Sequence, residues 1–453
     1  MSFCYCCFTQ YINNIMEEFN RKIRAGSTFL YRKDGVESQI FEVRMKSRIK
    51  DNALNDACRM AFKRYPYLNT KLRLHSDGLY YLDKCPFKPI PQRRKRFRAL
   101  GSMSVQYHII DITVNKKSIY IAFHHGMCDG LGIMPFIRTL IYYYLSYPNY
   151  KRSKLQVPGL RLAKTPLLEG ETADPTVDGN FEIDASKVFR YEKPQCFRLP
   201  ELESEQTHYC RWEIEFTEDD FMKVCKQLNC TPVILTSLML QKAIAKTNNT
   251  DGKTIMSNVV CDWRKVLGVE NTFRNCVSCV YLPYGEEEKQ LSIGEFGVKS
   301  KELLNKQREV DSARTNAMIM KTVADKLESM PYDDRVKMMQ QMSGFINDTF
   351  TMSYLGRAMM GDMEQYIDGL HIYTSGDRGL TIEMINIAGK FVIDLKQSFL
   401  TDKYVNAFMQ EFQNIGLNGT VSPRIDFQIP KDKTTSMDLF EYIAYLYRKI
   451  RRK

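Results

Sequence analysis

Apolar residues in the first third of the chain follow two different periods. Residues 51–65 carry them at helical spacing, and a proline directly afterwards should end that helix. Residues 104–110 and 118–123 instead predict two strands, with a turn near residues 115–117 between them. The second strand runs into two adjacent histidines, and residues 133–147 then predict a strongly apolar helix. We therefore expect an N-terminal half in which helices and strands alternate.

A stretch that contains several prolines separates this half from a second one. Residues 151–205 also include an acidic segment, and we interpret them as a connector. A strand predicted at residues 209–216 then leads into a helix at 217–228, which its leading threonine should cap. A threonine–proline pair at residues 231–232 marks the start of another helix. Further strands are predicted at residues 255–261, 276–282, 370–374, 380–387 and 390–395.

The predicted fold class is α/β, or α+β, with two halves of similar size. The first half is expected at residues 1–150, the connector at 151–205 and the second half at 206–417. Residues 418–453 are expected to form a linker followed by a basic amphipathic helix. That helix either packs on its own domain or makes weak contact with a membrane surface or a partner.

Composition indicates an ordinary folded protein, because 44% of its 453 residues are hydrophobic and 26% are charged. No apolar run reaches the roughly 18–20 residues that a membrane span needs, and the first 20 residues lack the pattern of a secretory signal. The 13 cysteines are scattered, unlike those of a secreted disulfide framework. We therefore expect a cytoplasmic protein, and a monomer.

The net charge of +12 favours anionic partners. The sequence carries no helix-turn-helix, zinc-finger or RNA-recognition pattern, so we do not expect nucleic acid among them. A phosphorylated cosubstrate or an acyl carrier protein fits the charge equally well. Cys276 and Cys279 form a CxxC pair, but no second pair completes a zinc site, so no metal is expected.

The strongest chemical signal in the chain is the segment His124-His125-Gly126-Met127-Cys128-Asp129-Gly130. Only six histidines occur, yet two are adjacent here at the end of a predicted strand. An imidazole can accept a proton at neutral pH, and a strand end holds it rigidly, as general-base catalysis requires. Gly126 and Gly130 permit a tight turn or a close approach, and Asp129 can lock the turn by pairing with a distant cation. A pair of structural histidines is the alternative interpretation.

This segment resembles the HHxxxDG signature of the CoA-dependent acyltransferase superfamily. The superfamily includes chloramphenicol acetyltransferase, condensation domains of nonribosomal peptide synthetases, plant BAHD enzymes and microbial alcohol acetyltransferases. The resemblance covers most of residues 20–415. The other segments that carry it are residues 61–68 (AFKRYPYL), 171–175 (ETADP), 262–264 (DWR), 273–275 (FRN) and 353–356 (SYLG).

The resemblance implies a role for each residue of the site. His125 would be the general base, and His124 would support it as part of the catalytic set. Asp129 would also belong to this set, pointing away from the substrate and pairing with Arg264. The remaining support residues would be Gly126, Gly130, Asn275 and Tyr354.

The resemblance also implies a fold and an activity. Two chloramphenicol acetyltransferase-like domains would enclose a substrate channel at their interface. The chain would transfer an acyl group, foremost acetyl, from a CoA thioester to a hydroxyl or amine of a small-molecule acceptor. Acyl-CoA or an acyl carrier protein thioester would be a cosubstrate, with no bound cofactor.

One departure indicates which branch of this superfamily the chain resembles most. The Asp-Phe-Gly-Trp-Gly motif of the plant enzymes is absent, and its nearest counterpart is residues 375–379 (SGDRG). The resemblance is therefore greatest to microbial alcohol acetyltransferase-like proteins. A carrier-protein-dependent, condensation-like enzyme that forms amides or lipid esters is an alternative. A non-catalytic binding homologue is a second, against which the intact histidine segment argues.

A run of basic residues precedes the histidine segment. Its members are Arg93, Arg94, Lys95 and Arg96. Such a run is either simply solvated or attracts an anion. The anion would be the phosphates of coenzyme A or the acidic surface of a carrier protein.

Overall fold

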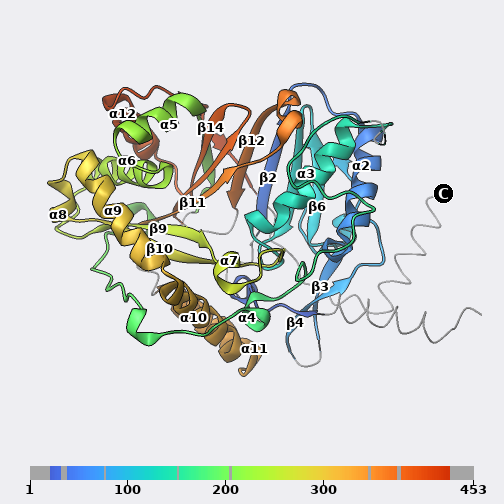
Figure 1. Ribbon diagram of the computed structural model, residues 1–453, viewed down its shortest axis with the longest axis horizontal. Helices are drawn as coiled ribbons and strands as arrows, with labels where there is room; N and C mark the ends of the chain where they lie inside the picture. Colours follow the sequence, from blue (N-terminus) through green and yellow to red (C-terminus); the bar gives the residue numbers. More distant parts are fainter. Residues whose placement is uncertain are drawn as a thin grey trace, which may run out of the picture.

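The computed structural model describes residues 21–31, 38–75, 78–149, 151, 153–203, 207–344, 348–374 and 379–428. Within these residues the chain forms two large sheets and a small one, with helices packed around them (Figure 1). Two large hydrophobic clusters, one associated with each large sheet, make up most of the buried core. This arrangement confirms the predicted mixed α/β class.

The first large sheet contains the strand that ends at the histidine pair. Its order is β12-β2-β7-β6-β5. Its N-terminal strands are β2 Ser38–Met45, β5 Gln92–Arg93, β6 Ile110–Asn115 and β7 Ser118–His124. The small sheet has the order β1-β4-β3 and comprises β1 Arg21–Lys22, β3 Thr70–Leu74 and β4 Tyr80–Lys84. Short 3-10 turns occur at η1 Ser27–Phe29, η2 Pro66–Leu68 and η3 Met103–Val105.

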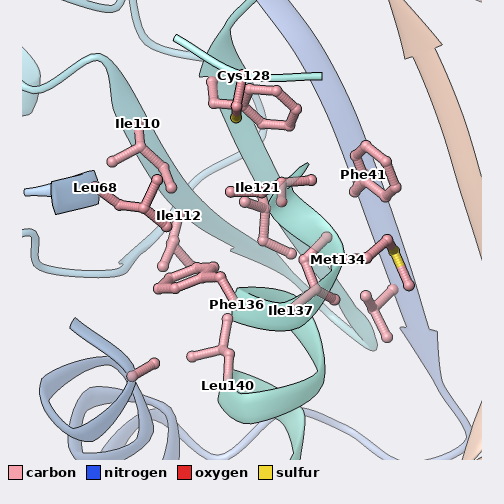
Figure 2. Packing of buried hydrophobic residues seen from close by; sticks show 14 of the residues in the cluster. Phe41, Leu68, Ile110, Ile112, Ile121, Cys128, Met134, Phe136, Ile137 and Leu140 are labelled. Carbon is pink, nitrogen blue, oxygen red and sulfur yellow. The ribbon is translucent and has the colours of Figure 1, made fainter. Parts of the chain in front are cut away.

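Two helices, α2 Asp51–Arg64 and α3 Gly130–Leu145, cover one face of the first sheet (Figure 1). Figure 2 shows the packing between α3 and the strands. Its members include Phe41 of β2, Ile121 of β7 and Phe136 of α3, all with no exposed surface. Burial of a large apolar side chain stabilises a fold by about 1.5–3 kcal/mol. This face therefore fixes β7, and with it the histidines at its end.

The predicted elements of the first half agree with the structure except at one strand. The helix expected at residues 51–65 is α2, and the helix expected at 133–147 is α3, which begins three residues earlier. The strand expected at 104–110 was wrong, because β6 begins only at Ile110. Gln106 and Tyr107 have φ angles of 55° and 65°, which an extended strand does not allow.

The second large sheet lies in the C-terminal half and has the order β10-β9-β11-β13-β14-β8-β15, with β16 also paired to β8. Its longer strands are β8 Cys210–Thr217, β9 Ile255–Asp262, β10 Val277–Tyr284, β11 Phe350–Arg357, β13 Leu380–Ile387 and β14 Lys390–Gln397. Each strand predicted at 209–216, 255–261, 276–282, 380–387 and 390–395 corresponds to one of them.

Helices surround this second sheet and join it to the connector. The connector contains α4 Pro175–Asp178, η5 Ala185–Lys187 and η6 Pro200–Glu203. The following helices are α5 Glu218–Gln227, α6 Pro232–Thr247, α7 Arg264–Leu267, α8 Glu286–Lys289, α9 Ile293–Arg308, α10 Val310–Glu328, α11 Tyr332–Gly344 and α12 Lys403–Asn414. A further 3-10 segment, η7, spans Gly361–Tyr366. The helix start expected at residues 231–232 is that of α6, and the Thr231 hydroxyl accepts from the Ile234 amide. The cap expected from Thr217 was wrong, because its side chain makes no capping hydrogen bond to α5.

One strand of the predicted second half belongs to the first sheet. Strand β12 Ile367–Thr374 pairs antiparallel with β2, so segments far apart in the sequence lie side by side (Figure 1). This strand lies within the expected second half, residues 206–417, but it completes the first sheet. Most of β12 is buried. Its apolar pattern would therefore fit an edge of either large sheet, and it does not indicate which sheet the strand joins.

The chain after residue 417 also differs from the expected linker. Strands β15 Thr420–Val421 and β16 Ile425–Asp426 both pair with β8 and extend the second sheet. The expected linker at 418–453 therefore begins with sheet residues. Such two-residue pairings leave little trace in a hydrophobic pattern. The predicted amphipathic helix lies outside the described residues.

Among the described helices, no single one is both long and apolar enough to cross a bilayer. Helices α5 and α6 are long and apolar enough only when taken together, and they are bent by 83° at the break between them.

Candidate active site

His124 and His125 have different environments at the end of β7. His124 is buried, and its Nδ1 accepts a hydrogen bond from the Gly126 amide at 2.9 Å. Burial, with a smaller contribution from His125, lowers the pKa of His124 to about 3. His124 is therefore uncharged at neutral pH, and its ring supports the turn. His125 is only partly buried.

The His125 ring packs against an aromatic side chain from the start of the described chain. Phe29 of η1 stacks on it with 4.0 Å between ring centroids and 10° between ring planes. The His125 carbonyl accepts a hydrogen bond from Asn275 Nδ2 at 2.7 Å. The ring and the backbone of His125 are thus held by segments from both halves of the chain.

Asp129 turns away from the histidines. Its Oδ1 accepts from the Gly132 amide at 2.8 Å and from Arg264 Nη2 at 2.7 Å. Its Oδ2 accepts from the Cys276 amide at 2.9 Å. The carboxylate therefore caps α3 and binds two separate points of the second half. The predicted ion pair between Asp129 and Arg264 is present, and both residues are buried.

Arg264 binds several backbone segments around Asp129. Its Nη1 lies 2.6 Å from Asp262. Its Nε donates to the Thr272 carbonyl at 3.0 Å, and its Nη2 donates to the Arg274 carbonyl at 2.8 Å. Burial alone would lower the pKa of Arg264, but Asp129 and Asp262 raise it above its usual value. The guanidinium stays charged and organises the loop that carries Asn275.

Gly126 lies where the chain passes closest to His124. A Cβ at Gly126 would stand 2.9 Å from His124 Nδ1 and 3.3 Å from Leu30 Cδ2. The reason for glycine is this close approach, because the φ angle of Gly126 is not positive. Gly130 has a similar role, since its Cβ would lie 3.1 Å from Leu355 Cδ2 of β11.

The connector contacts the site through a buried ion pair. Glu171 receives two hydrogen bonds from Arg64, at 2.9 and 2.8 Å, and one from the Tyr67 hydroxyl at 2.7 Å. Burial opposes ionisation, but these donors lower the pKa of Glu171. Tyr67 also stacks on Phe273, with 4.3 Å between centroids. Three of the segments singled out in the sequence therefore contact one another.

The nearby thiols are unsuited to act as nucleophiles. Cys128 and Cys276 are both buried. Burial raises the pKa of each thiol well above its usual value, so neither forms a thiolate at neutral pH. Of the ionisable groups in the turn, the partly exposed imidazole of His125 is the one suited to proton transfer.

Tyr354 and the basic run lie outside the histidine turn. The Tyr354 hydroxyl donates to Asn386 at 2.8 Å on β13, and burial raises its pKa to about 12. The basic run lies in and after β5, at the far edge of the first sheet from β12. Arg93 is paired there with Asp51.

Phe29 was missed by the sequence analysis, because it belongs to no periodic pattern or matched segment.

One group of buried side chains has the composition of a metal site. Among the described residues, Glu213, His371 and Asp394 place potential ligand atoms within 4.8 Å of one another. Arg211 already donates to Asp394 at 2.7 Å and lies 2.8 Å from Glu213. A guanidinium therefore occupies the position of a cation, and we interpret the group as an ionic network between the sheets.

The folded chain resembles solved acyltransferases. No protein-family model and no curated protein sequence matches it. Trichothecene 15-O-acetyltransferase TRI3 of Fusarium sporotrichioides aligns over 87% of this chain and 94% of its own, with a TM-score of 0.60 and 11% identity. TRI101 of F. graminearum, crystallised with coenzyme A and T-2 mycotoxin, aligns over 89% and 99%, with a TM-score of 0.56 and 11% identity. The chain therefore shares its fold with these two proteins.

A condensation domain has the same fold. The domain from the monacolin K polyketide synthase MokA aligns over 87% of this chain and 96% of its own, with a TM-score of 0.51 and 12% identity. Within this shared fold, the segment from His124 to Gly130 connects the end of β7 to α3.

Proposed function

We propose that the chain is an acyltransferase that moves an acyl group, foremost acetyl, from a CoA thioester to a hydroxyl or amine acceptor. The observation that carries this proposal is the environment of His125. It is partly exposed at the end of a fixed strand, while Asp129 in the same turn is fully engaged elsewhere. The fold, shared with an acetyltransferase crystallised with coenzyme A, supports the choice of donor.

His125 acts as the general base in the proposed reaction. It takes the proton from the acceptor as the acceptor oxygen or nitrogen bonds to the thioester carbonyl carbon. When the carbon–sulfur bond breaks, His125 returns that proton to the departing thiolate, so no further reactant is needed. His125 Nδ1 is buried, and we therefore assign proton transfer to Nε2.

His124 and Asp129 position the base in this mechanism. His124 keeps its Nδ1 on the Gly126 amide, which fixes the turn, and its low pKa keeps it uncharged. Asp129 joins the turn to Arg264 of the second half. The two halves would align donor and acceptor in one channel at their interface, and such alignment contributes more than general-base action alone.

The test follows release of free thiol from acetyl-CoA and longer acyl-CoAs with a panel of alcohols and amines. His125→Ala should lower kcat by about 10²–10⁴-fold, the usual contribution of a general base. His75→Ala is the matched control, because this histidine pairs with Asp83 in the small-sheet region and should retain activity. Equal turnover by wild type and His125→Ala, or no turnover with any thioester, would reject the proposal.

A carrier-protein-dependent reaction is the second candidate. The MokA condensation domain shares the fold, and the chain is strongly basic. Acyl-phosphopantetheine attached to a carrier protein should then give a higher kcat/KM than the matching acyl-CoA. Preference for free acyl-CoA would favour the first candidate.

A further inference from the structure

A cavity lies on the face of the first sheet opposite α2 and α3. Its volume is about 140 Å³. Its apolar walls are Phe97, Tyr120, Tyr373 and Phe427, which pack together with Ile40 and Ala122 as a small separate cluster. Tyr120 and His124 point to the same face of β7, four residues apart, which corresponds to roughly 13 Å along the strand. The cavity is therefore well removed from the histidine turn.

Positive charge dominates the lining of this cavity. Arg94, Lys95 and Arg96 lie at its edge, all exposed, and Arg211 lies within it. Arg94 donates to Gln92, a neutral partner, at 3.0 and 2.8 Å. In the part of the chain that the structure describes, no carboxylate forms an ion pair with any of the three edge residues. Their charges are thus available to a ligand.

The one carboxylate in the lining does not offset this charge. Glu42 accepts from Arg44 at 3.0 Å, from Arg211 at 3.2 Å and from the Ser118 hydroxyl at 2.7 Å. Burial raises the pKa of Tyr120 to about 12, so this phenol also carries no negative charge at neutral pH. Arg211 is itself paired with carboxylates, so the uncompensated cations beside the aromatic rings are the three exposed edge residues.

We propose that this cavity binds a compact organic phosphate, with the phosphate at Arg94, Lys95 and Arg96 and an attached apolar group against the aromatic walls. Guanidinium groups bind phosphate oxygens in pairs, and lysine adds a point charge. A cavity of this volume admits a small molecule or one end of a larger one, not a macromolecular surface. The ligand is either a free phosphorylated metabolite or the phosphate end of a larger cosubstrate. This inference does not rest on the proposed function.

Phenyl phosphate, which combines both features, is the probe for isothermal titration calorimetry with the full chain. We expect saturable binding that weakens as salt increases. The Lys95→Ala/Arg96→Ala double variant should weaken it at least tenfold, with an unchanged Tm because both side chains are exposed. Arg93→Ala is the matched control: its side chain is paired with Asp51 and does not line the cavity, so affinity should remain within twofold.

Competition identifies the source of the phosphate. Displacement of phenyl phosphate by coenzyme A, but not by pantetheine, would indicate the larger cosubstrate. Failure of coenzyme A to displace it would indicate a free phosphorylated metabolite. The proposal is overturned if phenyl phosphate does not bind, or if Arg93→Ala weakens binding as much as the double variant does. A failure to detect acyl transfer would concern the proposed role of His125, and it would not affect this binding test.

Discussion

Arg264 Nη2 lies 2.7 Å from Asp129 Oδ1, and this ion pair joins the histidine turn to the second half of the chain. The same carboxylate caps α3 and accepts from the Cys276 amide. The histidine turn is therefore shaped by contacts between residues far apart in the sequence, while the proposed base remains partly exposed.

Removing the charge of Asp129 should damage the fold more than the proton transfer. Loss of one partner of a buried ion pair costs on the order of 3 kcal/mol, so Asp129→Asn should lower the free energy of unfolding by about that amount in urea. Asp56→Asn, at an exposed pair with Arg59, should change it by under about 1 kcal/mol. The pH profile of residual acyl transfer should match wild type. A shifted profile with normal stability would show that Asp129 takes part in the chemistry.

The Phe29 ring should affect catalysis through the orientation of His125. Aromatic pairs contribute about 0.5–1.5 kcal/mol, so Phe29→Ala should lower kcat/KM by roughly 2–10-fold. Phe29→Tyr retains the stacked ring and should restore activity. We would measure kcat and KM separately, because a misplaced base lowers kcat. An unchanged kcat in Phe29→Ala would exclude this positioning role.

His371 should make stability depend on pH above neutrality. Burial alone would lower its pKa, but neighbouring carboxylates raise it above 6.5. The carboxylates that act on it are Glu42 of β2, Glu213 of β8 and Asp394 of β14. Arg44 and Arg211 are paired with the same carboxylates. Because the folded pKa is raised, the stabilisation is fully present below about pH 6.5 and is lost as the pH rises through the folded value.

His371→Gln should therefore be less stable than wild type at pH 6, by about 1–3 kcal/mol, and show a flatter decline in Tm between pH 6 and 9. Equal slopes in wild type and His371→Gln would contradict the assignment. Stabilisation by added Zn²⁺ that His371→Gln abolishes would instead show a metal site at Glu213, His371 and Asp394.

Gly132 should tolerate no side chain. A Cβ there would lie 2.0 Å from the Phe273 carbonyl oxygen, so α3 and the Arg264 loop would have to separate. Gly132→Ala should lower the free energy of unfolding by about 1–3 kcal/mol, measured in urea. Gly294→Ala near the start of α9 is the control, because its nearest contact is 4.0 Å away. Similar stability of the two variants would show that this contact can relax.

The sequence allowed prediction of those features that depend on local pattern. Helix α3 is apolar along most of its length, and the histidine segment is compact enough to recognise, so both could be found. The ion pair of Asp129 with Arg264 was predicted through resemblance, since no local rule joins residues so distant. Phe29 could not be found, because its stacking on His125 depends on tertiary packing alone. The same holds for β12, because its pairing with β2 also depends on tertiary packing.

Strand β12 has a consequence for synthesis of the chain. Because Ile367–Thr374 supplies an edge of the first sheet, the sheet that carries His124 is incomplete until these residues have left the ribosome. A nascent chain that ends after the connector exposes the bare edge of β2, which is a template for aggregation. The two halves are therefore expected to mature together rather than one after the other.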